Sequence, residues 1–508
     1  MNADEVALAT LGYKQEFKRH FTYLELFGLS FSIIGVVQSI AAVLVYSIPY
    51  GGPVSMVWGW LTGSVFILCI AASIAELGSA APTSGGLYYW TFALAPEVIQ
   101  KYLAWLIGYT NTIGYMSGVA GFDYSCALSI LTAASIASDG NFIPTTAQIY
   151  GVFCAVVVSH AALASLATKL IARLQLFFIF LNMSVFIGLL VVVPIKTPSG
   201  FQNEASYAFG HFENISGYPN GFAFFMSLLA PLWSIGGFDS SVHISEEAQN
   251  AKIAVPFAIM TSTGFGCLLG FAVNILLAFN MGTDLVSIIS SPFGQPMAVI
   301  FLNCLGKSGT MAFWILIVVL LYMSGLDLLL ASSRQTFAFS RDGALPFSKV
   351  LYHMNATTAT PVYCVLFSGF IACILGLLSF AGTAAIGAIF SMGVVCQYIC
   401  YLTPIVLQLF FGKKFSPGPF SLGNASFLVS GLAVAFMVFM IVVLMFPTAP
   451  APTASSMNYT VVVVGGTLLL STLYYLVSGR LWFSGPVCTV DGGANADHVN
   501  DKIGEVEI

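Results

Sequence analysis

The chain has 508 residues and a formal net charge of −5, but only 7% of its residues are charged and 58% are apolar. A soluble domain carries about 25% charged residues, so this composition predicts a protein that crosses a membrane many times. The sequence has no basic stripe for nucleic acid and no enzyme or metal motif such as H-E-x-x-H, so we expect no nucleic-acid partner, no metal and no cofactor.

The first 26 residues contain Lys14, Lys18 and Arg19 and no apolar run, which predicts a cytoplasmic segment and not a cleavable signal peptide. Apolar stretches then recur along the chain, and they predict an all-α integral membrane protein with twelve transmembrane helices. The predicted spans are 27–48, 54–76, 99–132, 147–167, 174–194, 221–245, 254–280, 309–338, 360–379, 383–411, 426–446 and 459–478.

Residues 27–478 are therefore expected to form one membrane domain in the lipid bilayer. Residues 479–508 form a second cytoplasmic segment, acidic and glycine-containing from Asp491 onward, and that part is expected to be disordered.

The positive charges orient these spans. With twelve spans, only Lys196 and Lys307 fall in loops opposite the N-terminus, and all other Lys and Arg residues share its side. The positive-inside rule then places both termini in the cytoplasm. The sequon at Asn214 lies in the long loop between the fifth and sixth spans, which this orientation places outside, so Asn214 is the predicted glycosylation site.

Two spans are interrupted at their middle by small and polar residues. The first span contains Ser32-Ile33-Ile34-Gly35, and the sixth contains Ser234-Ile235-Gly236-Gly237. A broken helix in hydrocarbon leaves backbone groups unpaired unless the break lines a polar cavity. Two such breaks five spans apart are typical of transporters built from inverted repeats.

The breaks suggest a site for a zwitterion. The half-helix that begins around Gln38 would point its free N–H groups and positive dipole end at a carboxylate. The half-helices that end near Ile33 and Ser234 would offer free carbonyls to an ammonium group. The alternative is that these glycines serve close helix packing, as Gly266 and Gly270 are expected to do. The predicted substrate-binding residues are Ile34, Gly35, Val36, Gln38, Ser39, Tyr124, Ser234, Ile235, Gly236, Gly237 and Phe238.

Four carboxylates lie within or at the edge of spans, where each costs about 2.5–3.5 kcal/mol on insertion scales. Asp123 and Asp327 could carry a coupling proton or bind a substrate ammonium group, unless neighbouring hydroxyls simply satisfy them. Asp239 is expected to cap the second half-helix. Glu76 is expected to act in a gate or to order a loop. These four acids are the candidates for coupling and gating.

Three predicted cytoplasmic loops carry recognisable motifs. They are Glu76 to Tyr88 (ELGSAAPTSGGLY), Arg341 to Pro346 (RDGALP) and Gly418 to Gly423 (GPFSLG). Together with Gly236-Gly237-Phe238-Asp239 and the Glu246-Glu247 pair, they resemble the amino acid/polyamine/organocation permeases, and most closely the fungal GABA and choline permeases. The resemblance covers roughly residues 20–480.

This resemblance implies a LeuT-like fold of five plus five inverted-repeat helices with two further C-terminal helices. It also implies uptake driven by a cation gradient, usually of protons in fungi, and an aromatic gate at Phe238. The fifth span offers Asn182 and no lysine, unlike some bacterial proton-coupled members, and a sodium site would rest on Ser324 alone. The resemblance does not fix the substrate.

We therefore expect a permease for amino acids or GABA-like zwitterions, with H⁺ as the coupling ion, in the plasma membrane or alternatively the vacuolar membrane. One alternative is choline or another organic cation, held by the aromatic faces of Tyr124, Trp233, Phe238 and Tyr398. A second is a nutrient receptor that does not transport, which the short predicted cytoplasmic segments disfavour.

Overall fold

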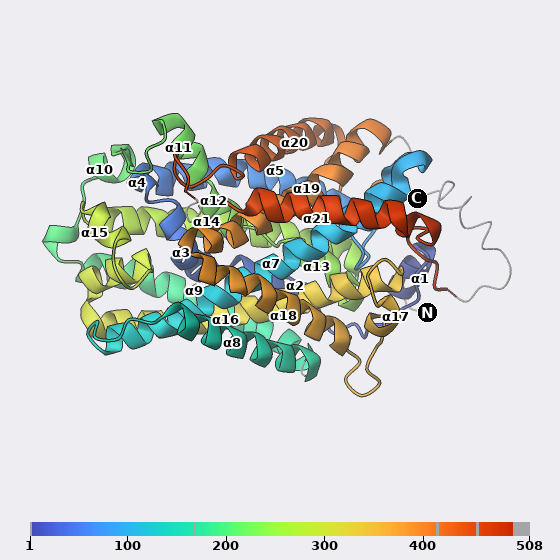
Figure 1. Ribbon diagram of the computed structural model, residues 1–508, viewed down its shortest axis with the longest axis horizontal. Helices are drawn as coiled ribbons and strands as arrows, with labels where there is room; N and C mark the ends of the chain where they lie inside the picture. The colour runs from blue at the N-terminus through green and yellow to red at the C-terminus, as the bar shows by residue number, and fades with distance from the viewer. Residues whose placement is uncertain (1–2, 167, 413–415, 454–456, 491–508) are drawn as a thin grey trace.

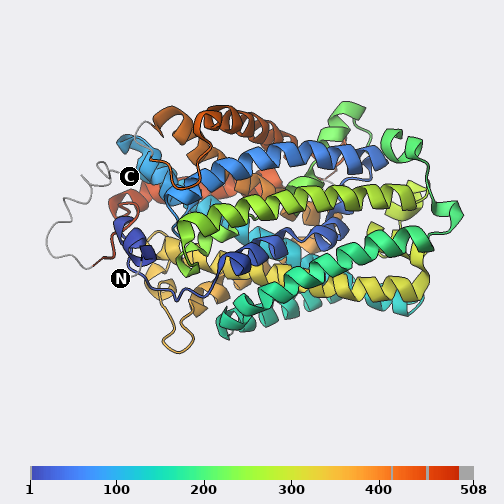
Figure 2. The ribbon, with the colours of Figure 1, turned by 180° about the vertical axis from the view of Figure 1, so that it is seen from behind.

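Long helices that run side by side along the long axis of the molecule make up most of the structure, a computed structural model that describes residues 3–490 except 167, 413–415 and 454–456 (Figures 1 and 2). Within these described residues, eleven helices are long and apolar enough to cross a membrane. The first of them consists of α2 (Tyr23–Ile34) and α3 (Val36–Val43), and the second is α5 (Trp60–Ala80) with the short α4 (Gly52–Val54) before it. The others are α7 (Glu97–Ala137), α8 (Thr146–Leu166), α9 (Thr168–Lys196), α14 (Ala251–Asn280), α16 (Pro296–Arg341), α18 (Val362–Gly376), α19 (Thr383–Phe411), α20 (Ser426–Val443) and α21 (Thr460–Val477).

The predicted sixth span is the one that no long helix fills. It is divided into α11 (Asn220–Ser227), α12 (Leu229–Ser234), α13 (Ser240–His243) and a 3₁₀ turn over Ser245–Glu247. The interruption predicted at Ser234 to Gly237 is therefore present, and it leaves no piece long enough to count as a spanning helix.

Three helices extend well beyond their predicted bounds. The predicted ranges are 99–132 for α7, 174–194 for α9 and 309–338 for α16. In α16 the extension includes a kink at Gly306, whose φ of 65° and ψ of 179° are not helical. Glycine adopts this conformation without the steric cost that a side chain would impose.

The interrupted first span lies at the centre of the bundle. In its most apolar window 94% of residues are buried inside the protein, against 17% for α21 at the periphery. An apolar helix buried on all sides belongs to the interior of a protein, whereas a half-exposed one faces lipid. The break in the first span is therefore shielded from the bilayer.

The two ends of the described chain meet at one end of the bundle. The N-terminal helix α1 (Ala3–Thr10) lies near the end of α21 (Figures 1 and 2). The amide of Thr489 donates to the carbonyl of Gly12 at 2.8 Å. The short helix α17 (Ser348–Leu351) lies at the same end (Figure 1), and the short helix α6 (Leu87–Leu94) precedes α7 in the chain. The disorder predicted from Asp491 onward lies outside the described residues.

The opposite end carries the loops that precede the sixth and eighth spans, with α10 (Ala205–Gly210) and α15 (Leu285–Ile289) (Figure 1). It also holds a small antiparallel sheet that the all-α prediction missed, formed by β1 (Tyr50–Gly51) and β2 (Glu213–Asn214). Asn214, the predicted glycosylation site, pairs with Tyr50 in this sheet, and its Nδ2 donates to the carbonyl of Tyr218.

Candidate functional site

The first helix break is a single residue wide. Helix α2 ends at Ile34, Gly35 adopts the left-handed conformation with φ 47° and ψ 79°, and α3 begins at Val36. A Cβ atom at position 35 would meet the end of the Gln38 side chain and would strain the backbone at this positive φ, so glycine is strongly favoured here. The first-turn amides of α3 have no acceptor within that helix, which leaves its positive end facing the break.

The carbonyls at this break correct one part of the sequence interpretation. The hydroxyl of Ser39 donates to the carbonyl of Ile34 at 2.7 Å, and the hydroxyl of Ser324 in α16 donates to the carbonyl of Ser32 at 2.5 Å. Two carbonyls near the predicted free end at Ile33 are thus already paired, because serine hydroxyls on α3 and α16 reach them.

The second break packs directly on the first. Helix α12 ends at Ser234, α13 begins at Ser240, and Gly237 between them has a φ of 76°. A Cβ atom on Gly237 would lie 2.8 Å from Ile33 Cγ2. The glycine is therefore required both for the backbone conformation and for the close approach of the two breaks.

Polar atoms without partners surround the two breaks. The hydroxyls of Ser32 and Ser234 and the Oε1 atom of Gln38 are buried and accept or donate no hydrogen bond within the described structure. The Nε2 atom of Gln38 donates to Asn182 Oδ1 at 3.1 Å and to Ser324 Oγ at 3.3 Å. An unpaired buried polar atom costs about 1–3 kcal/mol, so these atoms suit a polar ligand.

The aromatic residues that are candidates for substrate contact have different ring neighbours. The Phe238 ring is stacked on Tyr401 with 5.3 Å between centroids. The ring centroids of Trp233 and Phe122 are 4.5 Å apart, and the ring of Tyr124 contacts the ring of Phe153 in α8. Phe238 and Trp233 therefore belong to the second break, whereas the ring contact of Tyr124 is with a different helix.

Asp239 does not have the capping role predicted for it. It occupies the N-cap position of α13, but its side chain makes no capping hydrogen bond. Instead its Oδ1 atom accepts from the Tyr401 hydroxyl at 2.7 Å, and Oδ2 lies 3.6 Å from His243 Nε2. The backbone carbonyl of Asp239 accepts from Val242, so the side chain is left to link α13 to α19.

The two acids of the third and eighth spans each lie against a nitrogen of another helix. Oδ1 of Asp327 accepts from Gln175 Nε2 of α9 at 2.7 Å. Oδ1 of Asp123 lies 3.0 Å from Nδ1 of His160 in α8, and both side chains are fully buried.

Glu76 accepts hydrogen bonds from the loop that precedes α20. Its carboxylate accepts from the Ser421 hydroxyl at 3.0 Å, the Leu422 amide at 2.9 Å and the Ser426 hydroxyl at 2.7 Å. Gln408 of α19 adds a further hydrogen bond at 3.2 Å. The carboxylate thus joins α5 to the Gly418–Gly423 motif that precedes α20.

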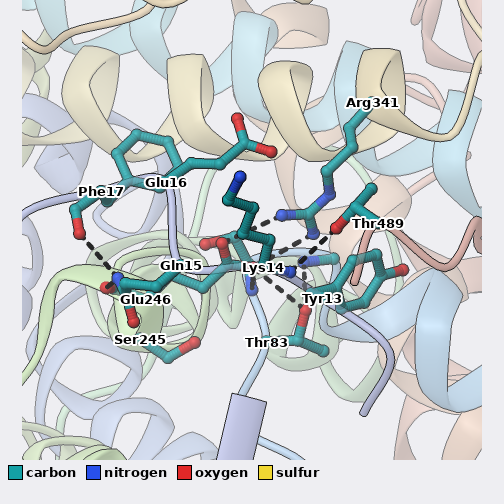
Figure 3. Close-up of polar contacts among 12 residues, drawn as sticks. Tyr13, Lys14, Gln15, Glu16, Phe17, Thr83, Ser245, Glu246, Arg341 and Thr489 are labelled. Carbon is teal, nitrogen blue, oxygen red and sulfur yellow. Dashed lines mark hydrogen bonds and ion pairs between the residues drawn. The ribbon is translucent and has the colours of Figure 1, made fainter. Parts of the chain in front are cut away.

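Two buried ion pairs close the bundle at the end where the termini meet. Arg341 Nη1 and Nη2 donate to the two carboxylate oxygens of Glu246 at 3.0 and 3.1 Å, and Arg334 Nε donates to Glu247 at 2.6 Å (Figure 3 shows the first). Burial alone would raise the pKa of Glu246, but the charge of Arg341 and hydrogen bonds from the Ser84 amide and the Thr83 hydroxyl outweigh it, so the pKa is lowered.

The N-terminal segment covers these ion pairs. The Arg341 guanidinium lies over the Tyr13 ring, 3.8 Å from its centroid, and Gln15 Nε2 donates to the Glu246 carbonyl at 2.8 Å (Figure 3). Beside them, the amide of Lys14 donates to the Thr489 hydroxyl at 2.9 Å (Figure 3). The C-terminal end of the described chain is therefore attached to the N-terminal segment that covers the ion pairs.

The Asp342 carboxylate accepts hydrogen bonds from residues near both ends of the described chain. Its Oδ2 accepts from the hydroxyls of Tyr88 at 2.7 Å and Tyr13 at 3.3 Å, and its Oδ1 accepts from the Val487 amide at 3.0 Å. Burial raises the pKa of Asp342 to about 6, although the charge of Arg341 and these hydrogen bonds oppose the rise.

Three of these residues are not singled out from the sequence. His160, Gln175 and Arg334 become significant only through a partner on another segment. One sequence signal was available, because Arg334 lies inside the apolar run predicted as the eighth span and a charge there requires a partner. The Glu246-Glu247 pair, noted only as a motif, supplies it.

Comparison with known proteins agrees with this architecture. Residues 21–467 match the family described as amino acid permease. An uncharacterized amino-acid permease of Schizosaccharomyces pombe is 39% identical over 96% of this chain and 91% of its own length. The GABA-specific permease of Saccharomyces cerevisiae is 39% identical over 95% of this chain and 86% of its own length, and amino-acid permease 2 of Neurospora crassa is 34% identical over 95% and 88%.

The extent of these matches covers both helix breaks, both ion pairs and all four candidate acids. A chain with a broken first span packed on a broken sixth segment has the form of a membrane transporter and not of an enzyme. This chain is a multi-pass membrane protein that belongs to the amino acid permease family.

Proposed function

We propose that this protein is a secondary transporter that takes up an amino acid or a GABA-like zwitterion together with a proton by alternating access. The substrate binds where the two interrupted segments meet, between Gly35 and Gly237. The coupling ion, the substrate and the site residues are all part of this proposal.

The observation that carries the proposal is the direct packing of two broken helices with unpaired polar atoms around them. The N-terminal end of α3 suits a carboxylate, because its first amides lack acceptors in the helix. The buried hydroxyls of Ser32 and Ser234 can accept hydrogen bonds from an ammonium group, and so can the Gln38 Oε1 atom. A zwitterion satisfies both kinds of group, whereas choline has no N–H to donate.

The arrangement of elements supports the finer topology that we propose. Eleven spanning helices together with the interrupted segment 220–247 make twelve crossings. An even number of crossings agrees with the meeting of Gly12 and Thr489 at one end. We assign this end to the cytoplasm, and we assign the helices to a LeuT-like arrangement of five plus five with two more, in the plasma membrane. Asn214 then lies outside, available for glycosylation.

In this orientation the gate at Glu246 and Arg341 is the inner gate, and it is closed. Substrate that reaches the breaks would be held away from the cytoplasm until the ion pairs separate. The N-terminal segment, with Tyr13 against Arg341, must move for the same opening.

The test is uptake of labelled GABA, neutral and basic amino acids, and choline into transporter-deficient fungal cells, with and without a protonophore. We expect uptake of a zwitterion that the protonophore abolishes. Choline uptake alone would replace the zwitterion site with an organic-cation site. Absence of all uptake by protein at the cell surface would favour a receptor and overturn the proposal.

The site is tested with Gly236→Leu. A Cβ atom on Gly236 would lie 3.1 Å from both Gln397 Oε1 and the Trp233 carbonyl, so a larger side chain fills the second break. We expect this variant to reach the membrane but not transport. Gly431→Leu on α20, where nothing lies within 4 Å of the added Cβ, is the matched control. Unchanged uptake by Gly236→Leu would contradict the site.

A further inference from the structure

Asp123 and His160 form a buried pair of polar side chains within the bundle, called the polar island below. Asp123 Oδ1 and His160 Nδ1 are 3.0 Å apart, and both side chains have no exposed area. Neither side chain has a hydrogen bond among the described residues, so the charge of each faces only the other. Each group therefore depends on the other for its charge balance.

The other titratable groups around this island do not supply a cation. The ring of Tyr322 on α16 packs edge-on against His160 with 4.2 Å between centroids, and its hydroxyl contacts Ser159 at 2.8 Å. The thiols of Cys126 on α7 and Cys373 on α18 lie within electrostatic range of Asp123. In the described part of the chain, no lysine or arginine forms an ion pair with Asp123.

The net charge of the island is therefore set by protons. With one proton shared between them, the carboxyl and imidazole groups are neutral as a unit. Loss of that proton leaves a carboxylate with no counter-charge in an apolar interior, which costs several kcal/mol. The proton can leave only when water reaches the site, and that occurs when the protein changes conformation.

We propose that Asp123 and His160 together are the site that carries the coupled proton. This inference rests on the proposed proton-coupled transport and assigns its ion site. On binding, the proton joins the imidazole nitrogen or the carboxylate oxygen, and on release it passes to water. No other chemical group changes in this step.

The backbone of α16 connects this site to the first helix break. Gly325 lies against the island, and a Cβ atom there would be 2.1 Å from Asp123 Oδ1 and 2.9 Å from His160 Cε1. The preceding residue, Ser324, donates to the Ser32 carbonyl at the break. Any expansion of the island on loss of its proton therefore displaces the residue next to one that holds the substrate site.

Two other buried acids fit this role less well. Asp327 accepts from the amide of Gln175, which does not titrate, so this contact cannot exchange a proton. His243, near Asp239, is engaged at both ring nitrogens, by the Ser84 carbonyl at 2.8 Å and by Asn111 Nδ2 at 3.2 Å. Those contacts fix the imidazole in place.

The experiment compares two activities of the purified protein in liposomes. The first is accumulation of the substrate identified in the uptake panel, driven by a pH gradient. The second is exchange of labelled for unlabelled substrate without any gradient. We expect His160→Gln and Asp123→Asn to lose accumulation, so that substrate only reaches equal concentrations on both sides, and to retain exchange. Wild-type protein gains about tenfold accumulation per pH unit for one coupled proton.

His211→Gln is the matched control. His211 is exposed and lies 3.3 Å from Glu213 in the loop before the sixth span, so it undergoes the same chemical change beside a carboxylate. We expect its accumulation to equal that of the wild type.

A second measurement does not depend on the transport cycle. Binding of the same substrate to detergent-purified protein is measured between about pH 5 and 8, the range in which histidine titrates. We expect the affinity of the wild type to change with pH and that of His160→Gln to be flat. Gradient-driven accumulation by His160→Gln, or an unchanged pH dependence of its binding, would overturn the inference. Accumulation by the wild type that follows sodium and not protons would also overturn it while leaving transport intact, and a wild type without any transport would refute the proposed function itself.

Discussion

Arg341 and Glu246 are bound to each other through both guanidinium nitrogens and both carboxylate oxygens, although 95 residues separate them in the chain. Both side chains are fully buried. Glu246 belongs to the turn that ends the interrupted sixth segment, and Arg341 ends α16. Their contact therefore joins the interrupted sixth segment to the helix that carries Ser324 and Gly325.

Replacing one of the two residues of this ion pair should lower the stability of the folded protein. Glu246→Leu leaves the guanidinium of Arg341 buried without a counter-charge, which costs about 3–5 kcal/mol. We expect a lower melting temperature of the purified protein. The double variant Glu246→Leu/Arg341→Met removes both charges and should recover much of this loss. If the double variant lost as much stability as the two single variants lose together, the two residues would not interact.

Docking of the two chain ends should depend on pH through Asp342. Burial raises the pKa of this carboxyl to about 6 in the docked form, above its ordinary value of 3.8. The docked form thus binds the proton more tightly, so docking strengthens as pH falls through 6 toward 4 and is weakest above 6. The change is at most about tenfold per pH unit.

Hydrogen exchange provides the measurement for this prediction. The amides of Val487 and Thr489 donate to Asp342 and Gly12, so their protection reports docking. After correction for the intrinsic exchange rate, protection should rise below pH 6 in the wild type. It should not vary with pH in Asp342→Asn, and an Asn variant that kept the same profile would exclude Asp342 as its source.

The left-handed glycine of the second break should not tolerate a side chain. Gly237→Ala imposes an unfavourable φ of 76°, at a cost of about 1–2 kcal/mol, and places a methyl group 2.8 Å from Ile33. We expect uptake to fall by about tenfold, the factor that corresponds to about 1.4 kcal/mol. Gly264→Ala on α14, which meets nothing within 4 Å, should transport like the wild type. Equal uptake by the two variants would argue against a substrate site at this break.

The carboxylate of Glu76 should be needed to hold the loop before α20. Glu76→Gln replaces one acceptor oxygen by an N–H donor that faces the hydroxyl and amide donors of Ser421, Leu422 and Ser426, at about 1–3 kcal/mol. We expect faster proteolytic cleavage between residues 416 and 425. Glu97→Gln at the exposed start of α7 is the control. Identical cleavage of both variants would mean that the loop is held by other contacts.

The helix breaks could be predicted because their causes are local. Gly35 and Gly237 stand in apolar runs with small and polar neighbours, and a glycine in the left-handed conformation ends a helix without help from distant residues. The span bounds followed from hydropathy for the same reason, and α19 begins and ends at the predicted residues 383 and 411. The kinked N-terminal part of α16 did not follow, because Gly306 interrupts a helix that continues on both sides.

The partners of the buried charges could not be predicted, because they come from other helices. Asp123 was noted as a costly acid in a span, but nothing in the sequence connects it to His160, which reads as an isolated histidine at a span end. Asp239 was expected to cap its own helix, the usual local solution, whereas the Tyr401 hydroxyl of α19 takes its side chain. Tertiary contacts decide between such alternatives, and the spacing of residues along the chain does not reveal those contacts.

The hydrogen bond from Thr489 to Gly12 also bears on how this protein is made. The N-terminal segment leaves the ribosome first, but its partner is synthesised only after the last membrane helix has been inserted. Until then the carbonyl of Gly12 lacks the amide that donates to it in the finished structure. Docking of the first segment on the last is thus a late assembly step.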